Sequence, residues 1–356
     1  MLEPRLIDDR MGGEPLYYFA QPKGILMRIS DQVKRCVGFV GIRTPSGTDW
    51  GGTAFFVSLN DALRGDATLE RKFPYMVTAK HVADKLNGSD WVVRINNRQG
   101  RSVEFEGTGT KWWEHPTESA TVDSAVTPFP FEKELDVATL SDSLFATPEL
   151  LEEYEIGVGD EVYAAGLFPK ITDTSKNQPV VRTGHFAMMP DEKIPFAEFG
   201  MIEAYLIETK SFGGLSGCPV FVRHTVSLPL TEESDSPPVE RLKRLYGGGS
   251  SYLLGSMIGH WRVPDESDPA LKDALNLGFA AVVPMYKIIE VLHHPELVAM
   301  RKTVIEEERK KRAATTVLDT AFGETDVQKT PKGAEIPVPT EDQFIGDLKK
   351  ASRKKN

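Results

Sequence analysis

The chain has 356 residues, of which 40% are hydrophobic, and a formal net charge of −10 at pH 7. This length predicts two folded cores, or one large core with tails, and the acidic balance argues against a protein that mainly binds the phosphate backbone of nucleic acids. No apolar run approaches the roughly 20 residues that cross a bilayer, the N-terminus lacks the apolar segment of a signal peptide, and two cysteines, Cys36 and Cys218, are too few for a disulfide framework. We therefore expect a cytoplasmic protein with reduced, buried thiols, and neither nucleic acid nor membrane as a partner.

Residues 1–29 show no clear period and are expected to form an N-terminal arm. Residues 30–155 change to short apolar runs, rich in β-branched residues and separated by turn residues, which is typical of antiparallel strands. The third of these runs carries His81 near its end, and the polar segment 61–73 before it is expected to be a surface loop. A helical turn is predicted at residues 147–154. The expected strands are Val33–Ile42, Gly51–Val57, Pro74–Asp84, Trp91–Ile95, Val103–Glu106, Lys111–Trp113, Asp123–Phe129 and, as the weakest, Leu135–Leu140.

Residues 156–294 continue the pattern of strands and then change period. Many short strands without alternating helices predict an all-β fold, a barrel or a sandwich. From Pro284 the period is helical, with apolar residues on one face. The highly charged residues 295–316 predict a further helix, and residues 317–356, poor in large apolar side chains, are expected to form a disordered tail. The strands expected in this half are Asp160–Leu167, Val180–Thr183, Met201–Thr209, Cys218–Val222, Tyr252–Ile258 and Leu277–Val283.

One serine, Ser216, lies among glycines directly before the apolar run Cys218–Val222. A serine hydroxyl is a poor nucleophile unless a base takes its proton and donors hold the oxyanion that forms. Neighbouring glycines allow a sharp turn and leave the backbone N–H groups of Gly214 and Ser216 free to point at one spot. The turn is therefore a candidate for nucleophilic catalysis, provided that the chain supplies a base and an orienting acid.

Taken in chain order, Thr78-Ala79-Lys80-His81-Val82, an Asp-x-Ala strand and Gly214-Leu215-Ser216-Gly217-Cys218-Pro219 resemble the chymotrypsin-like (trypsin-like) serine peptidases, and most closely their disulfide-free, bacterial-type branch. The resemblance covers roughly residues 30–293. It implies two six-stranded antiparallel β-barrels, at 30–155 and 156–294, with the catalytic groups at their junction and a closing C-terminal helix. It also implies that His81 is the general base, Ser216 the nucleophile, and the N–H groups of Gly214 and Ser216 the oxyanion hole.

The acid is open between two positions, because Asp123-Ser124-Ala125 and Asp136-Val137-Ala138 both match Asp-x-Ala. Asp123 is preferred, because it follows His115-Pro116 and leaves room for another strand before the second barrel. Two departures from the family pattern, Leu215 before the serine and Cys218 after it, remove no catalytic group.

The resemblance also predicts where a substrate lies. Residues 255–261 are similar to the strand that pairs with substrate backbone, so Ile258, Gly259 and His260 are expected to line that edge. The sequence thus favours a serine endopeptidase that acts on proteins or peptides and uses no cofactor. No metal-ligand spacing is present. The alternative is a catalytically silent peptidase-fold module that binds peptides or senses a partner, and a weaker reading is an esterase. The natural substrate, the cleavage preference and the oligomeric state do not follow from the sequence.

Overall fold

The structure is a computed structural model that divides into two compact units, Met1–Leu297 and Val298–Asn356. The segment expected to be an N-terminal arm lies outside the described residues except for its last position. The described residues are 29–62, 70–131, 133–169, 171, 175–196, 199–210, 213–224, 250–262, 276–323, 327–329 and 335–337.

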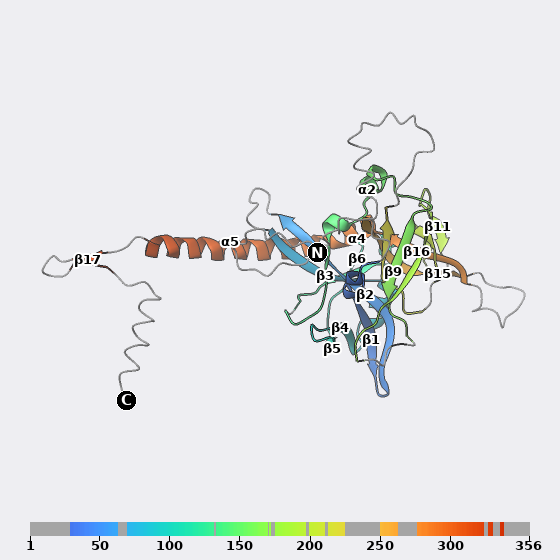
Figure 1. The fold of residues 1–356 in the computed structure, drawn as a ribbon, viewed down its shortest axis with the longest axis horizontal. Helices are drawn as coiled ribbons and strands as arrows, with labels where there is room; N and C mark the ends of the chain where they lie inside the picture. Colours follow the sequence, from blue (N-terminus) through green and yellow to red (C-terminus); the bar gives the residue numbers. More distant parts are fainter. Residues whose placement is uncertain are drawn as a thin grey trace, which may run out of the picture. The chain divides into compact units, whose positions relative to one another are not determined.

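The first half of the larger unit is an eight-stranded sheet in the order β5-β4-β1-β2-β3-β7-β6, with β8 paired to β2 (Figure 1). A closed six-stranded barrel, expected for this half, is not confirmed, because within the described residues no pairing joins the edge strands β5 and β6. The edge strand β6 has only two residues and offers little backbone to pair. The strands are β1 (Val37–Thr44), β2 (Gly47–Ala62), β3 (Glu70–Thr78), β4 (Trp91–Asn96), β5 (Ser102–Glu106), β6 (Trp113–Glu114), β7 (Ala125–Pro128) and β8 (Leu140–Ser141).

Several local predictions for this half differ from the structure. The first expected strand begins later, because Ser30 caps a 3₁₀ turn, η1 (Asp31–Arg35), by accepting from Gln32 N at 3.3 Å. Of the expected loop 61–73, the described residues 61–62 and 70–73 are strand, since β2 and β3 stay paired as far as Ala62 and Glu70, and residues 63–69 lie outside the described residues. Of the expected strand 135–140, only the last residue enters β8, and Leu135 makes an isolated bridge.

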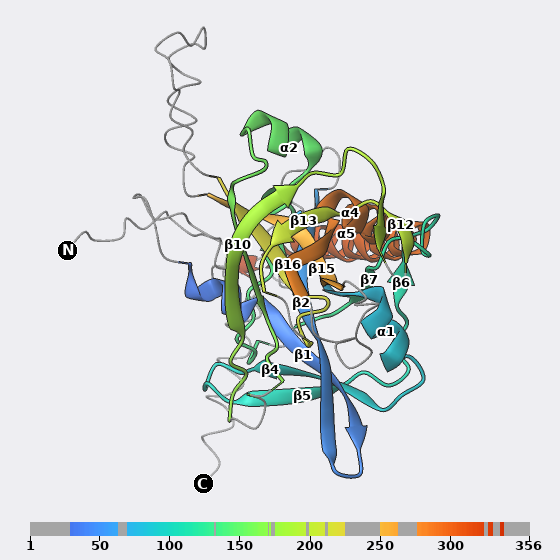
Figure 2. The same cartoon turned by 90° about the vertical axis from the view of Figure 1, so that its right-hand side faces the viewer.

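The second half of the larger unit is a closed six-stranded barrel in the order β10-β13-β16-β15-β14-β9, as predicted (Figure 2). Alternate residues of its strands fill the interior, among them Val162 and Ala164 of β9. The single strand predicted for 201–209 is split, because β11 (Ile194–Phe196) and β12 (Gly200–Ile202) form a separate hairpin. The barrel strands are β9 (Glu161–Gly166), β10 (Val180–Met188), β13 (Tyr205–Glu208), β14 (Pro219–Arg223), β15 (Ser251–Arg262) and β16 (Asn276–Pro284).

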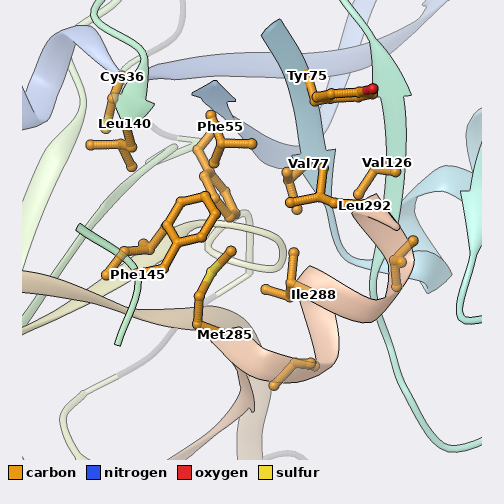
Figure 3. Close-up of a cluster of buried hydrophobic side chains, with 14 of the residues drawn as sticks. Cys36, Phe55, Tyr75, Val77, Val126, Leu140, Phe145, Met285, Ile288 and Leu292 are labelled. Atoms are coloured by element: carbon orange, nitrogen blue, oxygen red, sulfur yellow. The ribbon is translucent and has the colours of Figure 1, made fainter. Parts of the chain in front are cut away.

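The two halves share one hydrophobic core, which the predicted closing helix α4 (Met285–Leu292) helps to fill. Figure 3 shows Met285, Ile288 and Leu292 of α4 pointing toward Phe55 and neighbouring side chains of the first sheet. Burial of such side chains stabilises by about 1.5–3 kcal/mol each before ordering costs. The core thereby fixes α4 against both halves of the larger unit.

The remaining helices are short, apart from one. The expected turn at 147–154 forms α2 (Pro148–Glu153), which Thr147 caps. The charged helix α5 (Pro295–Gly323) continues past residue 316, since no glycine or proline interrupts it before Gly323. In the smaller unit, β17 (Val327–Lys329) pairs with β18 (Glu335–Pro337), within the segment expected to be a disordered tail. None of the helices in the described ranges is long and apolar enough to cross a membrane.

Candidate active site

His81 lies in the first turn of a short helix, α1 (Lys80–Leu86), and the prediction that its strand continues through residue 84 is wrong. β3 ends at Thr78, and Ala79 takes the extended conformation that precedes a helix, with φ of −67° and ψ of 141°. Residues of α1 on one face, Val82 and Leu86 among them, pack into the core of the first sheet. Figure 2 shows α1 beside β6 and β7, in agreement with an ion pair from Lys80 to Glu114.

Asp123 holds His81 at two points. Its Oδ1 accepts a hydrogen bond from the His81 backbone N–H at 2.8 Å, and its Oδ2 lies 2.7 Å from His81 Nδ1. The first bond satisfies an N–H group that has no partner within the helix. A carboxylate can only accept, so the second bond places the ring proton on Nδ1 and leaves Nε2 as the acceptor. The Asp123 side chain is fully buried, whereas that of His81 is 28% exposed.

The other candidate acid has a different partner. Asp136 forms an ion pair with Arg35, with an oxygen-to-nitrogen distance of 2.6 Å, and its backbone N–H donates to Asn96 O. Within the described residues it makes no contact with His81. The contacts of the two aspartates therefore favour Asp123 as the partner of the imidazole.

The turn that contains Ser216 is held against β15 by backbone hydrogen bonds. Cys218 N donates to Leu215 O at 2.9 Å and closes the turn. Gly217 N donates to Met257 O, and Met257 N donates to Cys218 O. Gly217 has a φ of +80°, which a residue with a side chain rarely adopts. The serine is thus placed by the geometry of the main chain around it.

The serine turn lies against the junction that leads into α1. A Cβ atom at Gly217 would fall 2.4 Å from Thr78 Oγ1 and 2.7 Å from Ala79 N, distances that only a glycine tolerates. Ser216 is also held against the first half of the unit, because its carbonyl oxygen accepts a hydrogen bond from the backbone N–H of Thr53 at 3.0 Å. The Ser216 side chain is partly exposed, and among the described residues its hydroxyl makes no hydrogen bond.

Thr53, on β2, joins the two halves at this point, and sequence reasoning missed it. It is fully buried, its hydroxyl donates to Gly214 O at 2.7 Å, and the same oxygen accepts from Leu167 N at 2.9 Å. Thr78 Oγ1 in turn donates to Thr53 O. A threonine inside the apolar run Gly51–Val57 was the available signal, because a buried hydroxyl needs partners.

The expected substrate edge belongs to β15. On the side of β14 the pairing of β15 ends at Ser256, and the following residues pair only with β16 among the described strands. Ile258 is buried in the shared core, so only its backbone could serve a ligand, whereas Gly259 and His260 are partly exposed. Phe199, in the hairpin of β11 and β12, has its ring 6.2 Å from that of His81.

Neither thiol competes with the serine as a nucleophile. Cys36 and Cys218 are free and fully buried, and burial raises the pKa of both thiols far above its ordinary value. Because the thiolate is the reactive form of cysteine, these side chains are inert in the folded protein. Within the described ranges, no group of three or more His, Cys, Asp or Glu residues is arranged to hold a metal ion.

No protein-family model matches the chain, and no curated protein matches it. Among solved structures it is similar to Deg5, with 15% identity and a TM-score of 0.39 over 72% of this chain and 87% of that one. A likeness this distant assigns no activity, so the interpretation of the site depends on its own geometry.

Proposed function

We propose that the chain is a chymotrypsin-like serine endopeptidase in which Ser216 is the nucleophile, His81 the general base and Asp123 the orienting acid. The observation that carries the proposal is the pair of hydrogen bonds from His81 to the buried Asp123, next to the turn that contains Ser216. In this reading the eight-stranded sheet takes the place of the first barrel of the fold.

The reaction then proceeds in two acyl-transfer steps. Ser216 Oγ attacks the scissile carbonyl carbon while its proton passes to His81 Nε2. The N–H groups of Gly214 and Ser216 stabilise the oxyanion, a type of contact worth about 2.7–4 kcal/mol per donor. His81 gives its proton to the departing amine as the C–N bond breaks. Water, deprotonated by His81, then releases the acyl group and restores the Ser216 hydroxyl.

Asp123 supports both steps without taking the proton itself. Its carboxylate binds Nδ1, so that Nε2 faces away from Asp123, and it stabilises the imidazolium that forms in each step. An extended substrate would pair with β15 at Ile258, Gly259 and His260, beyond the point where its pairing with β14 ends, and main-chain hydrogen bonds there would supply affinity.

A fluorophosphonate probe, which reacts with activated serines, tests the proposal. We expect the wild-type protein to be labelled and Ser216→Ala to lose the label. Ser143→Ala removes an exposed serine of another region and is the matched control, which should label like wild type. A folded wild-type protein that takes no label contradicts the proposal. Digestion of a peptide library then separates a peptidase from an esterase.

A second candidate function is a silent module that binds extended peptides. It is favoured by one observation: among the described residues the Ser216 hydroxyl has no hydrogen bond, and none joins it to His81. Catalytic hydrogen bonds are often long in a site without substrate, so this geometry also fits an enzyme. The module is supported if the wild-type protein does not react with the fluorophosphonate probe and binds peptides without cleaving them.

A further inference from the structure

Asp123 stands at the far end of a loop, residues 115–124, which we call the acid loop. The loop connects β6 to β7, and these strands pair at Trp113 with Val126 and at Glu114 with Ala125. Strand pairing thus fixes the two ends of the loop. What fixes its course between them decides where the Asp123 carboxylate lies.

Helix α4 contacts the acid loop through two side chains that lie about one helical turn apart. Lys287 Nζ donates to Glu118 Oε2 at 2.6 Å, and Glu290 Oε2 lies 2.8 Å from Nε2 of the buried His115. His115 Nδ1 accepts from the backbone N–H of Glu118 at 3.0 Å. The Glu118 carbonyl accepts from Val122 N at 2.9 Å, and Val122 directly precedes Asp123. A short chain of contacts therefore leads from α4 to the acid.

Lys287 also reaches the other segment beside His81. Its Nζ lies 3.5 Å from Glu203 Oε2, directly after β12, in the hairpin region that carries Phe199 next to the imidazole ring. The lysine side chain is only 11% exposed. One ammonium thus joins the loop that leads to Asp123 with the segment that carries Phe199.

The positive charge of Lys287 is balanced by nearby carboxylates. Burial disfavours the ammonium of Lys287, but its hydrogen bond to Glu118 and the nearby carboxylates of Glu203 and Glu290 outweigh this effect and raise its pKa. The same hydrogen bond lowers the pKa of Glu118. Removing Lys287 would leave Glu118 and Glu203 without their shared cation, and removing Glu118 would leave the largely buried ammonium of Lys287 with one partner fewer, so the segments would separate or take up water.

We propose that Lys287 is a positioning residue, which holds the acid loop and the β11–β12 hairpin so that Asp123 and His81 stay aligned. This inference rests on the proposed peptidase function. Displacement of a catalytic group by about 1 Å can cost on the order of 10²-fold in rate. Lys287 touches no reacting atom in this proposal, and its effect passes through Glu118 and Glu203.

Kinetics of Lys287→Met on a fluorogenic peptide test this role. We expect kcat to fall about 10²-fold with KM nearly unchanged, because alignment and not binding is lost. Lys287→Arg should recover part of the rate. Lys193→Met is the matched control, because Lys193 contacts the same Glu118 at 3.9 Å but is half exposed, and it should keep the wild-type rate. If Lys287→Met loses no more rate than Lys193→Met, the proposal is overturned.

A spectroscopic readout separates alignment from simple loss of stability and needs no turnover. In a Ser216→Ala background, the His81 Nδ1 proton bonded to Asp123 should give a downfield proton NMR signal. Lys287→Met should shift or abolish this signal, and Lys193→Met should leave it. A variant that melts earlier yet keeps both signal and rate shows a structural role only and overturns the proposal.

Two further outcomes are decisive. If Lys287→Met does not fold, Glu118→Gln removes the same ion pair from its more exposed partner, and the same rate and signal changes are expected. If the wild-type protein neither labels nor turns over peptide, the proposed function fails. The NMR comparison still decides whether Lys287 aligns His81 with Asp123.

Discussion

The two parts of the candidate site are held in different ways. His81 and Asp123 are joined by two direct hydrogen bonds, one from the main chain and one from the side chain. Ser216 has no side-chain bond among the described residues and is located by the backbone bonds of its turn. The imidazole is thus held by direct bonds to one side chain, while the position of the serine depends on how closely two distant segments pack.

This difference indicates where each part is vulnerable. The alignment of His81 should fail when Asp123 or its supports change. The location of Ser216 should fail when the contact between Gly217 and the β3–α1 junction is opened, or when Thr53 loses its bonds. Each part can therefore be disturbed separately.

The largest effect should come from the acid. We expect Asp123→Asn to lower kcat by about 10⁴-fold, because an amide can donate to Nδ1 and hold the wrong ring tautomer. Asp136→Asn should leave kcat within a few-fold, because its carboxylate pairs with Arg35. Steady-state kinetics of the two variants check this, and equal losses would contradict the assignment of the acid.

The second largest effect on kcat should come from the packing of the serine turn. In Gly217→Ala the new methyl group meets Thr53 O and Thr78 Oγ1 at 2.4 Å. The turn must then move away from α1, and we expect roughly a 10²-fold loss of kcat, with a stability loss of at least about 1 kcal/mol from the positive φ. Probe labelling rate and urea unfolding measure the two losses. Gly47→Ala also changes a glycine of positive φ, but in open space, and is the control that should keep the labelling rate.

At Thr53 the expected effect is a loss of stability. Thr53→Val keeps the shape but leaves Gly214 O and Leu167 N without their partner, at a cost of about 1–3 kcal/mol for each buried group. Thr53→Ser keeps the hydroxyl and should lose far less. Urea unfolding of both variants tests this, and equal stability of the two would show that the hydroxyl is not needed.

The smallest effect is a pH dependence of stability at the acid loop. The pKa of Glu118 is lowered by its hydrogen bond with Lys287, so this pair stabilises the fold above the ordinary glutamate pKa, and the contribution disappears as the pH falls through the folded-state value. The pKa of Lys287 is raised, so its own contribution disappears only as the pH rises past the ordinary lysine value. Urea unfolding of wild type and Glu118→Gln should differ at neutral pH and converge in acid. A difference that persists at the lowest pH contradicts this.

Local patterns in the sequence predicted a good part of the fold. Short β-branched runs predicted an all-β fold, the resemblance predicted the closed barrel of the second half, and an apolar stripe predicted α4. The same patterns could not show that β6 has only two residues, or that no pairing among the described strands joins β5 to β6, because pairing depends on strands far apart in the chain. Nor did they show α1, whose short run of residues after Thr78 reads equally well as strand.

For the site, spacing found the residue types but not their supports. The preference for Asp123 over Asp136 came from its sequence context, and the contact with His81 favours it, while its catalytic role stays a prediction. Lys287 was not found, because the partners that explain a lysine within an apolar helix, Glu118 and Glu203, are distant in the sequence. Contacts of this kind follow only from the packed structure.

The burial of both cysteines has a practical consequence for work in solution. The chain has two cysteines, and neither exposes a thiolate while the protein is folded. A single cysteine placed on the surface would therefore be the one site that maleimide reagents modify. Fluorescent or spin reporters could be attached near the β11–β12 hairpin without first removing a native residue.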